Sequence, residues 1–160
     1  MRWLILLLLV PFPTFADSWS GHPRVVDGDT IAIGQTRLRL LSMDAFESAQ
    51  TCKRDGTEYS CGSEATRALI GLIDQHEVLC DGDRRDRFNR PLVRCFINDL
   101  DLGRAMVRAG WALAEFGHEY DQDQLDARAA QVGAWAGTFT PPKDWRRAKR
   151  AMVDPTWPAR

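Results

Sequence analysis

A short hairpin pattern in the first third of the chain constrains the fold more than any other feature of the sequence. Two apolar runs, residues 30–33 and residues 36–41, are separated only by Gly34 and Gln35. Two such runs joined by a Gly-containing pair predict adjacent antiparallel strands with a tight turn. In the second run Arg39 alternates with leucines, so the arginine and leucine side chains face opposite sides of the predicted strand.

Acidic residues flank this predicted hairpin on both sides. Asp27 and Asp29 precede the first strand in an Asp-Gly-Asp turn, and Asp44 and Glu47 follow the second strand. Because an antiparallel return brings both ends of a hairpin together, we expect these two acidic clusters to lie close to one another. Carboxylates with a backbone carbonyl form a hard oxygen site of the kind that Ca²⁺ prefers. Each acid taken singly is more often a solvated turn residue, so the prediction of a metal site rests on the set.

Two arginines are candidates for holding a phosphate group near this site. Arg39 lies near the end of the second strand, and Arg90 closes the turn of residues 86–90 ahead of a later strand. A guanidinium group offers a fork of donors that matches phosphate oxygens. Two such groups facing one cation would clamp a phosphodiester and stabilise the extra charge of its transition state. The alternative for each arginine is an ordinary surface ion pair.

The N-terminus has the pattern of an export signal. Arg2 precedes an apolar run from Trp3 to Val10, and the small residue Ala16 follows. We predict a signal peptide over residues 1–16, because the apolar run is too short to span a bilayer; an uncleaved anchor is the alternative. Cleavage removes one arginine and no acid, which changes the formal net charge from −1 to −2. We therefore expect an exported protein, periplasmic or secreted, with no membrane contact after cleavage and no compositional bias toward polyanions.

The four cysteines all lie downstream of this segment, which favours disulfide bonds in an oxidising compartment. Neighbours along the chain would pair as Cys52–Cys61 and Cys80–Cys95, which is one of the possible connectivities. Two successive predicted strands support the second pair, since a polar turn between them would place Cys80 opposite Cys95. A zinc site is the alternative, although the chain has no Cys-x-x-Cys pair.

The rest of the sequence predicts an α+β fold. Three strands come first, followed by a helix that Ser63 caps and that ends near residue 74. Two further strands precede helices over residues 101–109, capped by Asp101, and over residues 121–132. Five strands with a helix between the third and the fourth is the order of an OB-type β-barrel, here with three packed helices. Such barrels often bind oligonucleotides, although a fold does not define a function.

Four segments of the chain resemble, in order and spacing, the motifs of the staphylococcal-nuclease (thermonuclease) family. They are Val26-Asp27-Gly28-Asp29-Thr30, Leu38-Arg39-Leu40-Leu41, Asp44-Ala45-Phe46-Glu47 and Asp86-Arg87-Phe88-Asn89-Arg90. The resemblance covers most of the mature chain, and four motifs in register are far more specific than any one of them. It implies an OB barrel with packed helices and Ca²⁺-dependent hydrolysis of DNA and RNA phosphodiesters that leaves 3′-phosphate ends.

The resemblance also implies a metal site. Asp29 and Asp44 match the family's carboxylate ligands, and Ala45 matches a position that ligates calcium through its backbone carbonyl. Asp27 is expected to support these ligands without touching the metal.

The catalytic and substrate-binding residues follow from the same resemblance. Arg39 and Arg90 match the phosphate-binding arginines, and Glu47 matches the acid proposed to orient or deprotonate the attacking water. Phe88 replaces a tyrosine that would contact the nucleotide, which removes a hydroxyl and keeps a stacking ring. Phe46 replaces a proline common in the family and is expected to loosen or reshape the turn that presents Glu47.

These observations divide the chain into a signal peptide (residues 1–16), a thermonuclease-like domain (residues 17–140) and a basic tail with Pro and Trp (residues 141–160). Contact of the basic cluster at residues 146–150 with a phosphate backbone is one interpretation, and a solvated tail is the one we favour. The predicted protein is a monomeric nuclease with little sequence specificity that acts on DNA, RNA or both. A catalytically inactive OB-fold oligonucleotide-binding module and a small disulfide-stapled periplasmic interaction domain are the alternatives.

Overall fold

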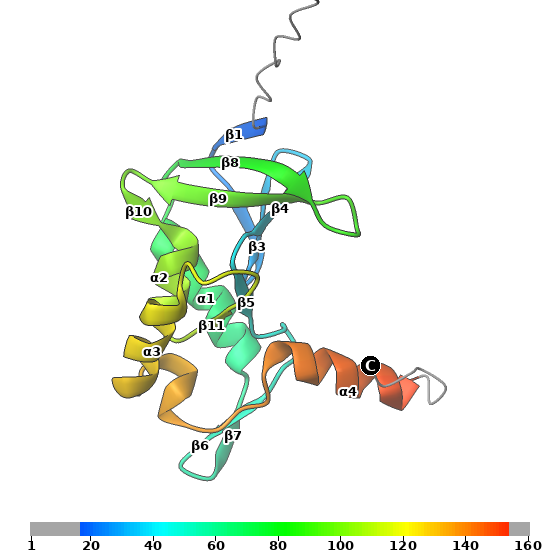
Figure 1. Cartoon of the computed structure of the whole chain (residues 1–160), viewed down its shortest axis with the longest axis vertical. Helices are drawn as coiled ribbons and strands as arrows, with labels where there is room; N and C mark the ends of the chain where they lie inside the picture. The colour runs from blue at the N-terminus through cyan, green and yellow to red at the C-terminus, as the bar shows by residue number, and fades with distance from the viewer. Residues whose placement is uncertain (1–16, 154–160) are drawn as a thin grey trace, which may run out of the picture.

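The computed structural model describes residues 17–153 of the 160-residue chain. The predicted signal peptide (residues 1–16) and the end of the predicted tail (residues 154–160) lie outside the described residues. The fold is α+β, as predicted: a large sheet lies beside a group of helices, with two small sheets next to them (Figure 1). Within the described part of the chain, no helix has both the length and the apolar character needed to cross a bilayer.

The predicted hairpin is present with its predicted turn. β3 (Thr30–Ile33) and β4 (Thr36–Leu40) pair antiparallel, and only Gly34 and Gln35 form the loop between them. Gly34 has a φ of 57°, in the left-handed region that two-residue hairpin turns require and that glycine adopts without strain. The pairing carries the end of β4 back beside the acidic turn that precedes β3, because the Leu40 N–H donates to the Asp29 carbonyl at 2.8 Å.

The main sheet has the strand order β1-β8-β9-β4-β3-β2, with β10 pairing on β9. Among the described strands of this sheet, only β4 and β9 run parallel to each other. The strands not yet placed are β1 (Asp17–Gly21), β2 (Arg24–Asp27), β8 (Val78–Arg85), β9 (Pro91–Ile97) and β10 (Leu100–Asp101).

The two outer strands of this sheet, β1 and β2, follow one another directly along the chain. His22 and Pro23 alone separate them, so β1 and β2 together form one interrupted strand whose halves pair with β8 and β3. If β1 and β2 are counted as one strand, the main sheet has the predicted order of three strands before α1 and two after it, apart from the short additional strand β10. The hydrogen-bonded path among the described strands is nevertheless open, and does not by itself form the closed barrel that the sequence predicted.

Helices form where the sequence predicted them, and the described residues contain one more. Asp101 caps α2 as predicted, since its side chain accepts a hydrogen bond from the Arg104 N–H at 3.2 Å. The helices are α1 (Cys61–Ile73), α2 (Leu102–Arg108), α3 (Asp121–Ala129) and α4 (Pro142–Val153), with a 3-10 turn η1 (Gly133–Ala136).

Two helix boundaries differ from the prediction. Ser63 does not cap α1 but lies in its first turn, because the Glu64 N–H already donates to the Ser60 carbonyl. α3 ends at Ala129, short of residue 132, because the Val132 N–H turns back to an earlier carbonyl of the helix. A larger error concerns residues 142–153. They were predicted to belong to a solvated tail, but in the structure they form α4.

The hydrophobic core lies between the main sheet and the helices α1 and α2. Leu69 and Ile73 on α1 and Met106 on α2 are buried against strand residues such as Leu38 and Val93. Full burial of a side chain of this size stabilises a fold by about 1.5–3 kcal/mol. This core holds the hairpin and the start of β9 in fixed positions, which matters for the site described below.

Both predicted disulfide bonds are present. Cys80 and Cys95 lie opposite each other on β8 and β9, as the predicted strand pairing required. The Cys52–Cys61 bond closes the segment before α1, and this segment contains a small hairpin of β6 (Cys52–Arg54) and β7 (Thr57–Tyr59). Because all four cysteines are bonded in pairs, none is available to bind zinc. Two disulfides fit a protein of an oxidising, extracytoplasmic compartment.

Candidate active site

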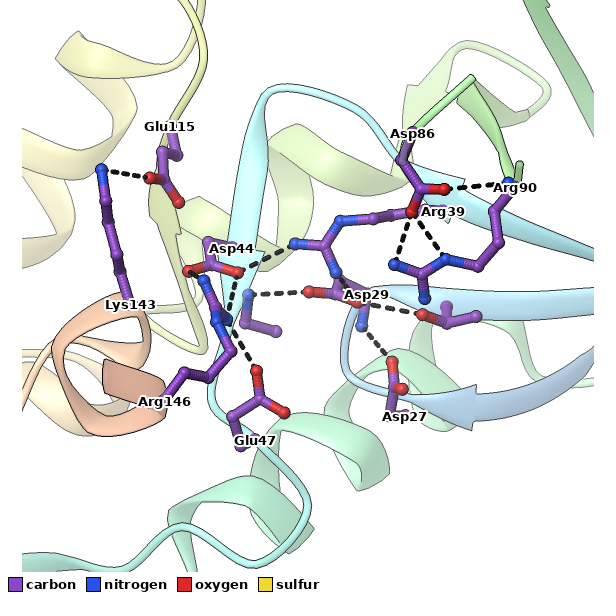
Figure 2. A network of polar contacts seen from close by, with 12 residues as sticks. Asp27, Asp29, Arg39, Asp44, Glu47, Asp86, Arg90, Glu115, Lys143 and Arg146 are labelled. Carbon is purple, nitrogen blue, oxygen red and sulfur yellow. Dashed lines mark hydrogen bonds and ion pairs between the residues drawn. The ribbon is translucent and has the colours of Figure 1, made fainter. Parts of the chain in front are cut away.

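The acidic turn before β3 fixes the position of Asp29, which is 6% exposed (Figure 2). The Asp29 N–H donates to the Asp27 carboxylate at 3.1 Å, and the Thr30 hydroxyl donates to Asp29 Oδ1 at 3.0 Å. A Cβ at Gly28 would lie 2.8 Å from the Cβ of Ala45, closer than real Cβ atoms approach. The Asp-Gly-Asp sequence therefore lets this turn pack against the strand that follows the hairpin. Asp27 contacts the main chain of Asp29, in keeping with the supporting position predicted for it.

Arg39 joins the two acidic ends of the hairpin. The register of β3 and β4 pairs Thr30 with Arg39, so the arginine lies directly beside the acidic turn. Its Nη1 donates to Asp29 Oδ1 at 2.7 Å and its Nη2 donates to Asp44 Oδ1 at 2.9 Å. The prediction that the hairpin brings Asp29, Arg39 and Asp44 together is confirmed.

Asp44 lies on β5 (Met43–Ala45), a short strand that pairs with β11 (Ala112–Ala114). It is 1% exposed. The next residue, Ala45, donates its N–H to Asp29 Oδ2 at 3.3 Å, so the main chain also links the two acids. The ligand role predicted for the Ala45 carbonyl stays a prediction.

Burial makes this cluster electrostatically unusual. Loss of water around Asp29 raises the pKa of its carboxyl group to about 7, although the Arg39 charge opposes the shift and the charges of Asp27 and Asp44 add to it. Burial alone would lower the pKa of Arg39, but Asp29 and Asp44 outweigh it and raise that pKa. Burial therefore disfavours the charged form of Asp29 more strongly than Arg39 favours it.

Glu47 lies just beyond this cluster and is held by main-chain contacts. Its N–H donates to Gln50 Oε1 at 3.2 Å, and its carbonyl accepts from the Gln50 N–H at 2.7 Å. Phe46 was expected to loosen or reshape this turn. Its ring is 1% exposed and meets Phe139 edge to face at 5.0 Å, so it anchors the turn and does not loosen it. That the turn is reshaped stays a prediction.

Arg90 lies at the end of the predicted turn and is paired within that turn. Its Nε and Nη2 lie 2.8 Å and 2.7 Å from Asp86 Oδ2, and its N–H donates to Asp86 Oδ1 at 2.9 Å. Burial is the largest single effect on Asp86 and would raise the pKa of its carboxyl group, but the hydrogen bonds from Arg90 and from the Phe88 N–H together outweigh it and lower that pKa. Leu92, two residues further on, pairs with Arg39 in the parallel ladder of β4 and β9. The turn therefore lies beside the acidic cluster. Among the contacts described, Arg90 pairs with Asp86 and does not reach the cluster.

The tip of the same turn exposes an aromatic ring. Phe88 is 65% exposed, and the guanidinium carbons of Arg87 and Arg90 lie 4.7 Å and 5.6 Å from its ring centroid. Asn89 has a φ of 64°. Asparagine tolerates this left-handed conformation better than most residues do. The stacking role predicted for Phe88 stays a prediction.

Sequence reasoning missed a third arginine of the site, Arg146 on α4. Its Nη1 and Nη2 donate to Asp44 Oδ1 and Oδ2, each at 2.9 Å, and Nη1 also donates to Glu47 Oε1 at 2.6 Å (Figure 2). Burial alone would lower the pKa of Arg146, but the hydrogen bonds to Asp44 and Glu47 outweigh it and raise that pKa. The solvated-tail interpretation is therefore wrong for this residue.

The helix itself could have been recognised from the sequence. Pro142 opens it, Asp144 lies in its first turn, and basic residues follow, which is the charge order that a helix dipole favours. The contact of Arg146 with Asp44 has no such local signal.

A second charged pair accompanies Arg146. Lys143 on α4 lies 3.4 Å from Glu115, which follows β11 (Figure 2). Burial raises the pKa of Glu115, and the nearby Asp44 raises it further. Neither Lys143 nor Glu115 was a candidate from the sequence. Lys143 and Arg146 are thus two cationic side chains that α4 supplies to the acidic side of the site.

The chemistry of this cluster suits a divalent cation. Within residues 17–153 no group of three or more His, Cys, Asp or Glu side chains is arranged to hold a metal ion, so two buried carboxylates, Asp29 and Asp44, are the side-chain ligands on offer. Main-chain oxygens and water would have to complete a Ca²⁺ shell of about six to eight oxygens. Burial is the main reason for the raised pKa of Asp29, and a cation beside the carboxyl group would favour its charged form. The donor set is hard oxygen, so the residues fit Ca²⁺ in donor type.

The fold and the site define a disulfide-bonded α+β protein in which a hairpin gathers buried carboxylates and arginines at one end. Comparison with known proteins gives the family. Residues 37–137 match the family described as "Staphylococcal nuclease homologue", which is more than half of the chain. The chain belongs to this family.

Three relatives illustrate the similarity. The chain is 32% identical over 138 residues to the succinoglycan biosynthesis protein ExoI of Rhizobium meliloti, covering 82% of this chain and 72% of that protein. It is 29% identical over 168 residues to protein ParB of Escherichia coli, covering 92% and 90%. It is 29% identical over 164 residues to the micrococcal nuclease of Shigella flexneri, covering 90% and 89%. Family membership and a nuclease among the relatives support a nuclease function.

Proposed function

We propose that this protein is a Ca²⁺-dependent nuclease that hydrolyses phosphodiester bonds of DNA, RNA or both with little sequence specificity and leaves 3′-phosphate ends. One observation carries the proposal: Arg39 bridges two buried carboxylates, Asp29 and Asp44, within 3 Å of each. A binding module has no need to bury two acids where a phosphate would lie. Family membership and the name of the Shigella flexneri relative add support.

The residues proposed to hold the metal are Asp29, Asp44 and the backbone carbonyl of Ala45. When bound there, Ca²⁺ supplies polarisation of a phosphoryl oxygen and offsets charge repulsion against the incoming nucleophile. Asp27 supports this arrangement through its hydrogen bond to the Asp29 N–H.

The two arginines at the hairpin side are proposed to clamp the phosphate. Arg39 is held rigidly by the sheet, and its guanidinium group already lies between the carboxylates. Arg90 lies at the end of the neighbouring turn, where it pairs with Asp86. It would bind a phosphate oxygen either in addition to Asp86 or in its place. Donors placed in this way each contribute roughly 10²–10³ in rate when they act on a developing charge.

Glu47 is proposed as the group that orients or deprotonates the attacking water. Its side chain is 36% exposed, so water reaches it while its backbone is fixed by Gln50. A carboxylate at this position can accept a proton and hold it at Oε1 or Oε2. In the structure Oε1 accepts a hydrogen bond from Arg146, and this contact would have to loosen for Glu47 to act. Phe88 is proposed to stack on a substrate base.

Several broader features belong to the same proposal. β1 and β2 are read as one bent strand that closes an OB-type barrel around the core, and the covalent link through His22 and Pro23 supports this reading. Residues 1–16 are proposed to be a signal peptide, and the two disulfides support export to the periplasm or the medium. The mature protein is proposed to act as a monomer.

A cleavage assay tests this proposal. The mature protein is incubated with labelled single- and double-stranded DNA and RNA, with Ca²⁺ or with excess EGTA, and the product ends are tested with a 3′-phosphatase. We expect cleavage only with Ca²⁺, and products that shift after phosphatase treatment. Cleavage that persists in EGTA would rule out the metal assignment. Binding of an oligonucleotide without any cleavage would identify the non-catalytic module instead.

Matched variants separate the proposed machinery from general charge. Glu47→Gln and Arg90→Ala are expected to lower turnover by about 10²-fold or more while circular dichroism stays that of the wild type. Arg84→Ala is the control, because Arg84 is an exposed arginine of the adjacent strand β8 that pairs with Asp83 at 3.7 Å. Wild-type turnover in Glu47→Gln or Arg90→Ala would remove that residue from the mechanism.

A further inference from the structure

Arg146 covers the carboxylate that the proposed metal site needs. Its two terminal nitrogens reach both oxygens of Asp44 in a fork, and Arg39 adds a second donor to Oδ1. A carboxylate oxygen accepts about two hydrogen bonds, so Asp44 Oδ1 is fully occupied by guanidinium groups. Figure 2 shows the Arg146 side chain reaching from α4 into the space between Asp44 and Glu47. A cation that binds Asp44 from this side meets a positive charge already in place.

The charge balance of the cluster points the same way. Asp29, Asp44 and Glu47 supply three carboxylates, Asp27 adds a fourth beside Asp29, and Arg39 and Arg146 supply two guanidinium groups. Withdrawal of Arg146 raises the formal surplus of negative charge from two to three, and it does so at Asp44 and Glu47, the carboxylates that Arg146 contacts. A divalent cation at Asp44 therefore meets less opposing positive charge once Arg146 has left. The nearby Lys143–Glu115 pair joins opposite charges and does not alter this comparison.

The helix that carries Arg146 is held to the body by few contacts. Figure 1 shows α4 projecting away from the other helices. Within the described helix α4, only Pro142 is buried, whereas Arg39 belongs to a strand inside the main sheet. A segment with little buried apolar surface opens locally at low free-energy cost. Arg146 can therefore leave Asp44 without disturbing the core, and Arg39 cannot.

From these observations, and resting on the proposed Ca²⁺ site, we propose that Arg146 is an internal counter-cation of that site. In the metal-free protein it neutralises Asp44 and Glu47. On metal binding it gives up Asp44, releases Glu47 from the same contact, and lets α4 loosen. Arg146 thereby sets the Ca²⁺ affinity and couples it to the position of α4. Such coupling is reciprocal, so Ca²⁺ weakens the docking of α4 by the factor by which docked α4 weakens Ca²⁺ binding.

Calorimetric titration of the mature protein with Ca²⁺, without substrate, tests the competition. Arg146→Met is expected to bind Ca²⁺ about tenfold more tightly than the wild type. Arg146→Lys, which keeps the charge and loses the fork, is expected to fall between them. The matched control is Arg147→Met on the same helix, because Arg147 pairs with Asp144 and not with the cluster. Its Ca²⁺ affinity is expected to equal that of the wild type.

Hydrogen exchange over residues 142–153 provides a readout that does not depend on activity. Ca²⁺ is expected to speed exchange of α4 amides in the wild type and to leave exchange unchanged in Arg146→Met. Melting temperatures without Ca²⁺ show that each variant is folded.

Three results would overturn the inference. Weaker Ca²⁺ binding by Arg146→Met would mean that Arg146 organises the ligands. If the wild type and Arg146→Met bound Ca²⁺ equally well, and Ca²⁺ left the exchange of α4 amides unchanged in the wild type, Arg146 would not compete with the metal. That result would leave the proposed nuclease function intact. Failure of both the wild type and Arg146→Met to bind Ca²⁺ would defeat this inference together with the metal assignment on which it rests.

Discussion

Two arginines hold the same carboxylate, and they reach it in very different ways. Arg39 lies five residues from Asp44 in the sequence and Arg146 lies 102 residues away. The first is delivered by a hairpin whose register follows from a local pattern of apolar residues and a Gly-containing turn. The second is delivered by α4, which lies beyond the residues 37–137 that match the family. The hairpin side of the site is thus built into the sheet, and the α4 side is added to it from outside.

The two regions also differ in how firmly they are held. The Arg39 side chain is 15% exposed and its strand has neighbours on both edges. The Arg146 side chain is 26% exposed, and its helix contributes one buried residue among those described. We expect the hairpin side to govern folding and chemistry, and the α4 side to govern access and metal affinity. The predictions below test this division.

The largest expected effect is that of Arg39→Met. It leaves Asp29 and Asp44 buried with one fewer counter-charge, and removal of one partner from a buried ion pair costs about 3–5 kcal/mol. We expect a loss of unfolding free energy of about 3 kcal/mol in urea titrations, together with loss of cleavage. Arg37→Met is the matched control, because Arg37 is exposed on the same strand. A stability loss no larger than that of the control would contradict the view that Arg39 is part of the fold's framework.

The same contrast explains what the sequence could predict. The hairpin, the convergence of Asp29, Arg39 and Asp44, and both disulfides depend on strand alternation, turn chemistry and the neighbouring pairing of Cys80 and Cys95. These are local rules, and the structure confirms them.

The errors arise where distant segments meet. No local pattern links Arg146 to Asp44, so the basic cluster at residues 146–150 was interpreted as part of a solvated tail. Phe46 was expected to loosen or reshape its turn, and the burial that prevents loosening depends on Phe139, which lies far along the chain. The small hairpin between Cys52 and Tyr59 was overlooked although its Asp55-Gly56 turn is a hairpin signal.

The second prediction concerns pH and the hairpin side. The folded protein raises the pKa of Asp29 from 3.8 to about 7. Between these values the folded state keeps a proton that the unfolded chain has released, so stability falls as pH rises toward 7. The urea midpoint should therefore fall more between about pH 5 and about pH 8 in the wild type than it does in Asp29→Asn. Equal drops in both proteins would show that Asp29 is not the titrating group.

The third prediction targets the residue that links the two regions. Gln50 is fully buried; its Oε1 accepts the Glu47 N–H, and its Nε2 donates to the Thr140 carbonyl at 2.7 Å, just before α4. Gln50→Leu leaves both main-chain groups without this partner, at a cost of about 2 kcal/mol. We expect lower stability and faster hydrogen exchange in α4, with the hairpin amides unaffected. Equally faster exchange in the hairpin would show that Gln50 supports the whole core and does not link the regions.

The smallest expected effects lie on α4 itself and decide how it docks. Arg146→Met removes one of two guanidinium groups from Asp44, which keeps Arg39, so we expect a stability loss of about 1 kcal/mol, well below that of Arg39→Met. Arg147→Met removes only an exposed pair with Asp144, and exposed pairs contribute about 0–1 kcal/mol. Urea titrations of the two variants compare neighbouring arginines on one helix. If Arg147→Met cost as much as Arg146→Met, α4 would be held by its overall charge and not by the contact with Asp44. A larger loss in Arg146→Met alone would locate the docking of α4 in that single contact, which is the contact that Ca²⁺ is proposed to replace.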